Sequence, residues 1–450
     1  MAKKQRLVVV GAVAAGTSAA AKAKRVNPEL EVILLERDPH ISYGACGLPY
    51  FIAGMIPSAE ALIARSPAEF QKQGIEVRTR HEVHEINVQD MSLRVVDQEN
   101  AREYRLPYDQ LVIATGAVSF RPPTPGLDLS GVFTLRTLHD GLMLHETLRR
   151  KRPGNVVIVG GGYIGLEMAE AFRALGLPVT IVEMAPQLMM NLDEDMSQLV
   201  LAEVERQGVR VLLNDGLVRC EGTNHVEKVV TQHNEIPAEL VLLAIGVRPN
   251  TRLAEQAGIK LGAGKAIAVD NHMRTNIEGI YAAGDCAETT HGVTGEKTYI
   301  PLGTTANKQG RIAGANAAGM NCTFEGVVGT AVAKIFGLEV ARTGLTEKEA
   351  IAKGVNVYAT TIRTTDRARY YPGATELHVK LIMDRISRRL LGAQLIGAQG
   401  AAKRIDVLAT ALYAQMTVDD LTRLDYSYAP PYASVWDATL IAANVLSRCS

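Results

Sequence analysis

Cysteine is scarce in this chain. Its 450 residues include five cysteines, widely scattered at Cys46, Cys220, Cys286, Cys322 and Cys449. No Cys-x-x-Cys pair or other metal-type spacing occurs, so we expect neither a disulfide framework nor a metal site. An odd, sparse set of cysteines in a chain of this length is typical of a cytoplasmic protein with free thiols.

Charge imbalance and long apolar runs are also missing. Lys plus Arg and Asp plus Glu are 48 each, so no bulk charge favours nucleic acid or an acidic surface. No stretch of about 18 residues is apolar enough to span a membrane. The basic start and the Ala-rich run after it resemble a secretory signal, but a strand, a glycine turn and a helix explain them better. Aromatic residues make up only 5%, so a local cluster of tyrosines is informative.

The first 36 residues have the pattern of a dinucleotide-binding unit. Residues 6–10 predict a buried parallel strand, Gly11–Gly16 a glycine turn, and the next residues a helix to about Arg25. A second strand, 31–35, ends at Glu36, an acid that suits ribose hydroxyls. Val13 occupies the second glycine position, and an ordinary strand–turn–helix unit is the alternative interpretation.

A second unit of the same kind begins at residue 155, and its pattern is complete. Gly160, Gly162 and Gly165 lie between an apolar strand and a helix that continues to about residue 175. The following strand, 179–182, ends at Glu183. This carboxylate should accept a bond from the ribose 2′-hydroxyl and repel a 2′-phosphate, which favours NADH over NADPH.

Strands that end in glycine recur between and after these units. Residues 108–117 end in Thr115-Gly116, and 240–249 repeat the pattern, which suggests that the second module is inserted into the first. The Pro-rich segment 121–125 predicts a stiff linker at a domain boundary. Residues 279–285 predict a strand followed by Asp285, which can bind sugar-like hydroxyls and can also cap a helix, since the two roles are compatible. Residues 301–318 predict a helix rich in small residues.

After about residue 325 the sequence pattern is no longer that of a dinucleotide-binding unit. We expect antiparallel strands at 355–363, 377–383 and 390–396, and an amphipathic helix at 401–416. Several tyrosines lie on Pro-containing loops at 370–373 and 425–432. Such tyrosines serve in packing, as interface anchors or in proton transfer. The predicted fold class is α/β: two Rossmann-like dinucleotide-binding domains, the second inserted in the first, and a C-terminal α+β domain.

The stretch Ser42–Tyr50 holds the most reactive candidate, Cys46. Small neighbours let a flat ligand approach, and Pro49 suits the first turn of a helix, whose N-terminus favours a thiolate. A buried structural cysteine is the alternative interpretation. Ten residues separate Cys46 from Glu36, and at about 3.3–3.6 Å per residue they are long enough to follow a dinucleotide to its reactive ring. Two dinucleotide units and one cysteine suggest electron transfer from NADH through a flavin to Cys46, which would cycle through a sulfenic acid or a mixed disulfide.

Five motifs carry a resemblance to a known family: Ser42–Tyr50, Gly160–Glu167, Ala282–Asp285, Lys403–Asp406 and Tyr428–Tyr432. From Val8 to Tyr432 the chain resembles the single-cysteine branch of the pyridine nucleotide-disulfide oxidoreductases. That branch contains coenzyme A-disulfide reductases, NAD(P)H sulfur or polysulfide reductases, NADH oxidases and NADH peroxidases. The resemblance implies FAD on residues 1–118 and 248–324, and NADH, with NADPH as the alternative, on 119–247. Residues 325–450 would then form the dimerisation domain of a homodimer.

The resemblance also implies roles for individual residues. Cys46 would be catalytic, Tyr428 would approach the flavin and sulfur of the partner subunit, and Tyr370 or Tyr371 would help to protonate a leaving thiolate. Tyr163 would cover the flavin and move when NADH binds. The implied cofactor-binding residues are Gly11, Ala12, Ala14, Gly16, Glu36, Arg37, Val83, Ala114, Thr115, Gly116, Gly160, Gly162, Tyr163, Ile164, Gly165, Glu167, Glu183, Gly246, Gly284, Asp285 and Ala306.

One position separates the activities within the family. The oxidases and peroxidases carry a histidine where this chain has Ala14, and alanine can neither donate nor accept a proton. The first glycine loop and the segment 370–373 look like those of the coenzyme A-disulfide reductases. In that group coenzyme A lies against the first helix, and the matching positions are Ser18, Lys22, Arg25, Ser42 and Asn307. Lys22 and Arg25 would bind phosphates, although a solvated basic face is the alternative.

These observations predict an FAD-dependent NAD(P)H oxidoreductase. It would reduce coenzyme A disulfide, coenzyme A persulfide or polysulfide through a mixed disulfide on Cys46. Ala45, where some coenzyme A enzymes have a polar amide, departs from that pattern. The first alternative is an NADH oxidase that reduces oxygen to hydrogen peroxide or water. The second is an electron carrier that acts through a protein partner.

Overall fold

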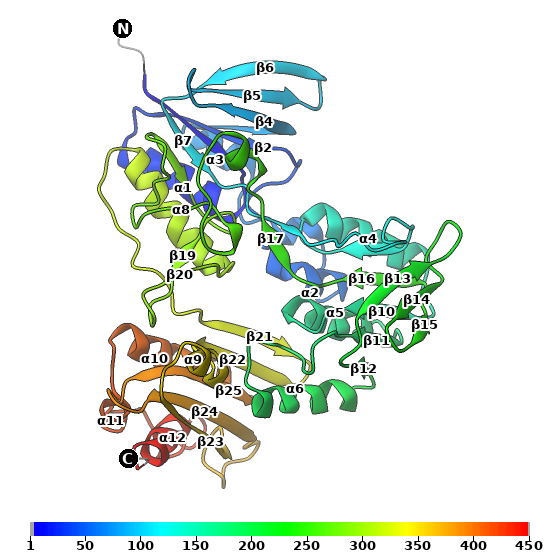
Figure 1. Ribbon diagram of the computed structural model, residues 1–450, viewed down its shortest axis with the longest axis vertical. Helices are drawn as coiled ribbons and strands as arrows, with labels where there is room; N and C mark the ends of the chain where they lie inside the picture. The colour runs from blue at the N-terminus through cyan, green and yellow to red at the C-terminus, as the bar shows by residue number, and fades with distance from the viewer. Residues whose placement is uncertain (1–3, 449–450) are drawn as a thin grey trace.

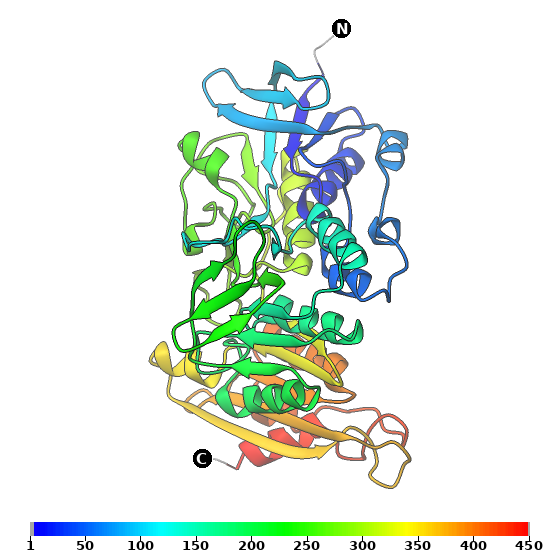
Figure 2. The same cartoon turned by 90° about the vertical axis from the view of Figure 1, so that its right-hand side faces the viewer.

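The computed structural model describes residues 4–448 (Figure 1). The blue N-terminal strands lie at one end of the long axis, and the orange and red C-terminal helices lie at the other (Figure 2). No helix among the described residues is long and apolar enough to cross a membrane.

The first module is built on a five-stranded sheet in which every pair of neighbours is parallel. In spatial order its strands are β18 (Ile280–Ala282), β7 (Gln110–Ile113), β1 (Arg6–Val10), β2 (Glu31–Glu36) and β3 (Ile75–Thr79). Four of its strands, β18, β7, β1 and β2, are almost wholly buried, as both faces of a parallel sheet require, whereas the edge strand β3 is largely half-buried.

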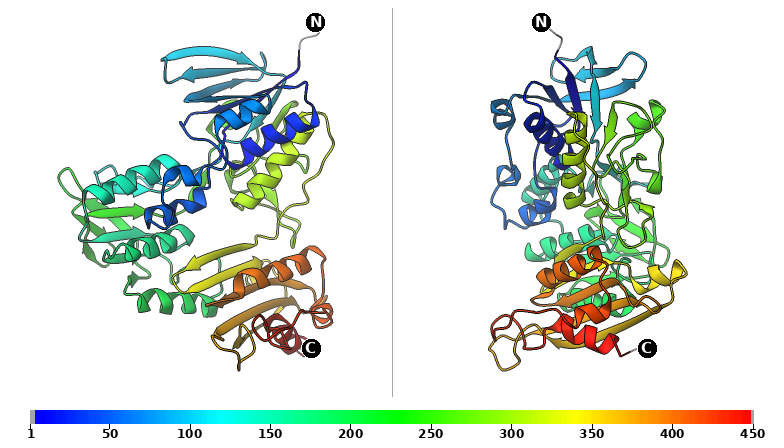
Figure 3. Two further views of the ribbon diagram at one scale, coloured as in Figure 1. Left: turned by 180° about the vertical axis from the view of Figure 1, so that it is seen from behind. Right: turned by 90° about the vertical axis from the view of Figure 1, so that its left-hand side faces the viewer.

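Two helices, α1 (Ala14–Val26) and α8 (Gly303–Ala317), lie side by side on this sheet (Figure 3). Glycines in α8 let the two backbones touch: a Cβ on Gly310 would lie 2.2 Å from the carbonyl oxygen of Ala15. Both helices lie close to their predicted ranges. Shorter helices in this part are α2 (Leu48–Ile52), α3 (Pro67–Lys72) and α7 (Arg252–Gln256).

An antiparallel sheet that the sequence did not indicate lies above the first module. It consists of β4 (His81–Asn87), β5 (Ser92–Asp97) and β6 (Arg102–Pro107). Charged residues break its apolar alternation, as in Arg102–Pro107, where only one of six residues is buried. The period-two signal that identifies a strand is therefore weak here.

The second module repeats the parallel arrangement. Its sheet, in spatial order, is β12 (Arg210–Leu212), β11 (Val179–Val182), β10 (Val156–Val159), β16 (Leu240–Leu243) and β9 (Val132–Thr134). The helices are α4 (Leu138–Arg150), α5 (Tyr163–Ala174) and α6 (Glu194–Arg206), with a small sheet of β13 (Leu217–Glu221), β14 (Lys228–Thr231) and β15 (Glu235–Pro237). The chain enters through β8 (Ala117–Ser119) and leaves through β17 (Val247–Pro249), which pair antiparallel. The second module is thus inserted in the first, as predicted.

The C-terminal domain is an antiparallel sheet with helices on both faces. The strands, in spatial order, are β21 (Ala331–Ile335), β22 (Leu338–Gly344), β25 (Leu390–Gly397), β24 (Glu376–Asp384) and β23 (Val357–Thr365). Its helices are α9 (Glu347–Ala352), α10 (Ala401–Tyr413), α11 (Val418–Leu421) and α12 (Ala438–Leu446). Two of these helices, α10 and α12, lie on one face of the sheet, and α9 lies on the other. The predicted fold class is confirmed, while the domain boundaries at 118, 247 and 324 stay a prediction.

Three predicted elements are too long, and left-handed backbone ends each of them. The strand predicted at 108–117 ends at Ile113, before Gly116 with φ of 67°. The strand predicted at 240–249 is divided at Gly246, with φ of 97°, into β16 and β17. The helix predicted to Met416 ends at Tyr413, because Gln415 has φ of 54°.

Candidate active site

The first glycine turn is shaped by close backbone packing. Gly11 has φ of 99°, and a Cβ there would lie 2.2 Å from the carbonyl oxygen of Ala114. A Cβ on Gly16 would lie 1.7 Å from the carbonyl oxygen of Gly11, so no larger residue fits either position. The carboxylate of Glu36 accepts hydrogen bonds from the N–H groups of Ala12 at 2.7 Å and Asp38 at 3.1 Å. Glycine turn and acid are therefore one rigid unit, with α1 beginning at Ala14.

The second glycine turn has the same geometry. Gly160 has φ of 109°, and its Cβ would lie 2.4 Å from the carbonyl oxygen of Ala244. A Cβ on Gly165 would lie 2.0 Å from the carbonyl oxygen of Gly160. Glu183 accepts from the N–H groups of Gly161 at 2.7 Å and Ala185 at 2.8 Å, as Glu36 does in the first module. Gly162 is the N-cap of α5, whose first residues are Tyr163 and Ile164.

Other predicted cofactor residues gather at the carboxyl ends of the first sheet. Thr115 and Gly116 follow β7, and the Thr115 hydroxyl donates to the carbonyl oxygen of Asn250 at 2.7 Å. Gly284 follows β18, and its Cβ would lie 2.8 Å from the Cβ of Ala15 and 3.5 Å from that of Ala306. This edge is where ligands bind in parallel α/β sheets.

Asp285 lies at the same edge and has a partner that sequence analysis missed. Nη2 of Arg136, from the connection between β9 and α4, donates to Oδ2 of Asp285 at 2.6 Å. Burial raises the pKa of Asp285, and the Arg136 charge opposes that shift. No helix begins directly after Asp285, so the helix-cap interpretation is wrong; the next helix, α8, begins at Gly303. Nothing in the sequence pattern distinguishes Arg136 from other surface arginines.

Cys46 lies in the turn Ala45–Gly47, directly before α2, and Pro49 is in the first turn of that helix as predicted. The turn is tied to the first glycine loop, because the N–H of Ser42 donates to the carbonyl oxygen of Ala12 at 2.8 Å. Among the described cysteines Cys46 alone is exposed; Cys220 and Cys286 are buried. This excludes the interpretation of Cys46 as a buried structural cysteine.

The electrostatics of Cys46 differ from the prediction. Desolvation by the surrounding protein raises the pKa of the Cys46 thiol, and the charge of Glu167 raises it further. Arg136 opposes both effects but does not reverse them. Desolvation thus opposes the thiolate that the helix N-terminus was expected to favour, and α2, with five residues, contributes only a short dipole.

Glu167 is the carboxyl that most affects Cys46. It lies on α5 beside a small cavity between α2 and α5, lined also by Pro49, Tyr50 and Glu170. Burial, together with the charge of Glu170, raises the pKa of Glu167 to about 7. Its charge can therefore change near neutral pH.

Two family models match this chain, one over the two dinucleotide-binding modules and one over the C-terminal domain. Residues 5–310 match the family described as pyridine nucleotide-disulphide oxidoreductase, and residues 330–439 match its dimerisation domain. The chain belongs to the pyridine nucleotide-disulfide oxidoreductases.

Three members of the family indicate the range of activities around this chain. It is 40% identical to an NAD(P)H sulfur oxidoreductase (CoA-dependent) of Pyrococcus abyssi over 98% of both chains. It is 37% identical to an NADH oxidase of Methanocaldococcus jannaschii, again over 98% of both. Among solved structures, an NAD-dependent persulfide reductase from A. fulgidus is 38% identical with a TM-score of 0.96, covering 99% of this chain and 83% of that one.

In this oxidoreductase the predicted substrate residues lie near the first glycine loop. The hydroxyl of Ser18 on α1 donates to Oδ1 of Asn307 on α8 at 2.7 Å. Lys22 and Arg25 lie further along α1, with Lys22 half-buried and Arg25 exposed. The guanidinium of Arg25 bonds to the carbonyl oxygen of Ala21 on its own helix, at 3.1 Å. The structure thus joins Ser18 to Asn307 but shows no contact that draws the two basic residues to them.

The predicted catalytic tyrosines lie in the C-terminal domain. The hydroxyls of Tyr370 and Tyr428 are 3.1 Å apart, and that hydrogen bond raises the pKa of Tyr428. Tyr371 is exposed beside them. The pair therefore unites two loops far apart in sequence and presents two hydroxyls at the surface.

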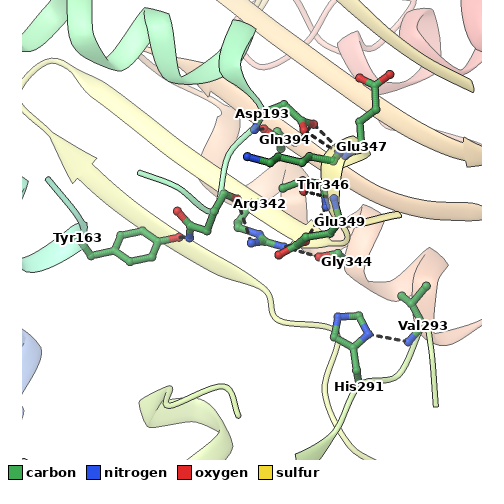
Figure 4. Close-up of polar contacts among 12 residues, drawn as sticks. Tyr163, Asp193, His291, Val293, Arg342, Gly344, Thr346, Glu347, Glu349 and Gln394 are labelled. Carbon is green, nitrogen blue, oxygen red and sulfur yellow. Dashed lines mark hydrogen bonds and ion pairs between the residues drawn. The ribbon is translucent and has the colours of Figure 1, made fainter. Parts of the chain in front are cut away.

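Tyr163 is connected to the C-terminal domain (Figure 4). Its hydroxyl accepts from Nδ2 of Asn191 at 2.9 Å, and the carbonyl oxygen of Asn191 accepts from Nη1 of Arg342 on β22 at 2.9 Å. Arg342 also pairs with Glu349 at 3.3 Å. Sequence analysis missed Asn191 and Arg342, because an isolated polar residue carries no periodic signal.

Two predicted cofactor residues have less distinctive places. Arg37 is exposed after β2. Val83 lies on β4, where it pairs with Val95, and its side chain is buried in the core. Val83 can therefore face a ligand only with its backbone.

Proposed function

We propose that the protein is an FAD-dependent NAD(P)H oxidoreductase that reduces coenzyme A disulfide, coenzyme A persulfide or polysulfide at Cys46. The observation that carries the proposal is the exposed Cys46, tied through Ser42 to the first of two glycine loops of the same geometry. The CoA-dependent sulfur oxidoreductase and the persulfide reductase among its relatives support this substrate class.

The glycine loops fit two dinucleotides. At Gly11 and Gly160 a side chain would collide with backbone. Each carboxylate accepts one N–H bond from its glycine loop and one from the residue two positions after it, which leaves carboxylate lone pairs for ribose hydroxyls. Gly11, Ala12, Glu36, Gly116 and Asp285 would hold FAD, and Gly160, Gly162, Gly165 and Glu183 would hold the nicotinamide nucleotide. When bound, FAD supplies two-electron chemistry between NAD(P)H and sulfur.

The thiol of Cys46 does the covalent work. As thiolate it attacks one sulfur of the disulfide, so that a bond from Cys46 to that sulfur forms and the original S–S bond breaks. The first thiol leaves as thiolate and takes a proton. Two electrons from NADH and a further proton then reduce the mixed disulfide, which restores Cys46 and releases the second thiol. The sum is one NADH, one proton and one disulfide converted to NAD⁺ and two thiols.

Residues beyond Cys46 bind the substrate and supply the proton. Ser18, Ser42 and Asn307 would bind polar parts of coenzyme A, and Lys22 and Arg25 its phosphates. In the homodimer that the dimerisation domain forms, Tyr370 and Tyr428 would enter the site of the partner subunit and protonate the leaving thiolate. Their exposed hydroxyls suit that role.

The experiment compares Cys46→Ser with Cys322→Ser, a half-buried cysteine, in the FAD-loaded enzyme. We expect Cys46→Ser to lose NADH-dependent reduction of coenzyme A disulfide and polysulfide by at least about 1,000-fold, because the nucleophile is gone. Cys322→Ser should retain it. Full activity of Cys46→Ser would contradict the proposal, and faster turnover with oxygen than with every sulfur substrate would favour the NADH oxidase alternative.

The nucleotide preference follows from Glu183. Its carboxylate is fixed by Gly161 and Ala185, and the neighbouring residues 184–187 contain no cation for a 2′-phosphate. We propose that NADH is preferred and that Glu183→Ala narrows the ratio of kcat/KM for NADH over NADPH by roughly 10-fold or more. Steady-state kinetics with both nucleotides test this, with the exposed Glu194→Ala as control. A wild-type enzyme that prefers NADPH would contradict it.

A further inference from the structure

The motif Lys403–Asp406 has no part in the chemistry described so far, yet Arg404 in it contacts both tyrosine loops. One loop, residues 366–375, joins β23 to β24 and carries Tyr370. The other, residues 422–437, joins α11 to α12 and carries Tyr428. The two loops meet at the hydrogen bond between these tyrosines.

Arg404 lies in the first turn of α10, and its side chain is 14% exposed. Its Nη2 donates to the carbonyl oxygen of Asp366 at 2.7 Å and to that of Tyr432 at 3.2 Å. One nitrogen thus joins the base of the first loop to the middle of the second. The planar guanidinium offers five N–H donors in a fixed arrangement, which a lysine cannot reproduce.

The other donors of Arg404 fix its own position. Nε donates to Oδ2 of Asp437 at 2.8 Å, and Nη1 donates to the carbonyl oxygen of Gly400 at 3.0 Å. Gly400 has φ of 85°, and a Cβ there would lie 2.2 Å from Nη1, so the glycine makes room for the guanidinium. Asp437 is 5% exposed and caps α12 through the N–H of Thr439, which fixes the end of the second loop.

Asp366 fixes the first loop in the same way. Its carboxylate accepts from the N–H of Thr375 at 2.6 Å and from Nε of Arg367 at 2.6 Å, so the two ends of the loop are joined. The hydroxyl of Ser434, from the second loop, donates to the carbonyl oxygen of Arg367 at 3.2 Å. The loops are therefore connected by Arg404 and Ser434, and their tips are joined by the hydrogen bond between Tyr370 and Tyr428.

We propose that Arg404 is a positioning residue that holds the hydroxyls of Tyr370 and Tyr428 within hydrogen-bond distance of each other. The inference rests on the proposed function, in which this pair supplies a proton to the leaving thiolate. The contacts of Arg404 are to the carbonyl oxygens of the two loops and of Gly400 and to the carboxylate of Asp437, and not to the tyrosine hydroxyls themselves. Arg404 holds the loop bases so that the two hydroxyls meet, and a displacement of about 1 Å at such a pair is enough to lower turnover strongly.

The test uses Arg404→Gln and Arg404→Lys in the FAD-loaded protein. The matched control is Lys403→Gln, since the neighbouring Lys403 has a side chain that is 92% exposed and pairs with Asp406 on its own helix. Tyr370→Phe removes the hydrogen bond directly and gives the reference value. The first readout is the pKa of Tyr428, measured by NMR titration of ring-labelled tyrosine, because the bond to Tyr370 raises that pKa.

We expect Arg404→Gln to shift the Tyr428 titration downwards to the value in Tyr370→Phe, and Arg404→Lys to shift it in the same direction. Lys403→Gln should leave it unchanged. Disulfide turnover at saturating NADH should fall by about 10- to 100-fold in Arg404→Gln, with KM for NADH unchanged. A merely structural role would lower stability without moving the titration.

An unchanged Tyr428 titration in both folded Arg404 variants would overturn the proposal. Arg404→Gln can fail to fold because Asp437 loses its partner. In that case Arg404→Lys, which keeps the positive charge, provides the test through its Tyr428 titration. If the titration moves but Tyr370→Phe retains full turnover, Arg404 is a positioning residue and the tyrosine part of the proposed function fails. The two failures are thus distinguishable.

Discussion

At the scale of single residues, the reactivity of Cys46 depends on two charges of opposite sign. Glu167 raises the pKa of the thiol and Arg136 lowers it, with desolvation as the largest contribution. Because burial raises the pKa of Glu167 itself to about 7, the negative charge beside Cys46 is present above neutral pH and absent below it. The electrostatic effect of Glu167 on Cys46 should therefore change near neutral pH.

Glu167→Gln should therefore make Cys46 more reactive only above pH 7. At pH 8 the wild-type carboxylate is ionised and repels the thiolate, and the amide does not, so we expect alkylation of Cys46 by iodoacetamide to be roughly two- to five-fold faster in the variant. At pH 6 Glu167 is protonated and the two rates should agree. Mass spectrometry of Cys46 alkylation measures this, with exposed Glu194→Gln as control. Equal rates at pH 8 would show that Glu167 does not act on Cys46.

At the scale of elements, α1 and α8 illustrate packing that overrides propensity. A Cβ on Gly314 would lie 2.1 Å from the carbonyl oxygen of Ala19, whereas one on Gly303, in the first turn of the same helix, meets nothing within 4 Å. Helix propensity favours alanine over glycine by about 1 kcal/mol at either site. Only at Gly314 does backbone contact oppose that gain.

Gly314→Ala should therefore destabilise the protein, and Gly303→Ala should not. Separating α1 from α8 to admit the methyl group costs about 2–3 kcal/mol, which exceeds the propensity gain. Thermal unfolding of the FAD-loaded variants measures the difference. Stabilisation by Gly314→Ala would show that the two helices adjust freely.

Sequence periodicity predicts elements of this kind well where they are buried on a regular face. The strands β1, β2, β10 and β11 and the helices α1, α5 and α8 lie within a few residues of prediction. The strands of the β4–β6 sheet were missed because their exposed faces carry charge, and β21 and β22 were missed because each is only partly buried. The two glycine loops, with Glu36 and Glu183, were predicted because their chemistry requires fixed spacing. Arg136, Asn191 and Arg342 act through contacts across modules that no local pattern records.

At the scale of the whole molecule, a buried charge cluster joins the second module to the C-terminal domain. Lys380 on β24, with a side chain 7% exposed, lies 2.9 Å from Asp195 and from Glu347 and 3.4 Å from Asp193. Asp193 also accepts a hydrogen bond from Nε2 of Gln394 at 2.6 Å. Figure 4 shows Asp193, Gln394 and Glu347 of this cluster. Burial alone would lower the pKa of Lys380, but the hydrogen bonds to Asp195 and Glu347 raise it overall.

Lys380→Met should weaken this junction. It leaves Asp193 buried without its cation, and we expect a loss of about 2–3 kcal/mol of unfolding free energy, at the low end for a broken buried pair because Asp195 and Glu347 are partly exposed. The pKa of Asp195 is lowered in the native protein, so its ionised form stabilises the wild type above the pKa of the unfolded chain. This stabilisation is lost as the pH falls through the lowered pKa. The difference in unfolding free energy between wild type and Lys380→Met should therefore shrink in acid. Thermal unfolding measures the loss of stability, with Lys403→Met as the control, whose unfolding free energy should stay close to that of the wild type. Equal stability of Lys380→Met and wild type at pH 7 would contradict the role of the cluster.

The central claim, that sulfur is exchanged at Cys46, is tested most directly by intact-protein mass spectrometry without reductant. The FAD-loaded protein, with Cys46 as the free thiol, is incubated with coenzyme A disulfide, and Cys46→Ser and Cys322→Ser are treated alike. The account predicts one coenzyme A adduct on the wild type and on Cys322→Ser, released by NADH, and none on Cys46→Ser. An adduct that persists in Cys46→Ser, or one that NADH does not release from the wild type, would contradict it.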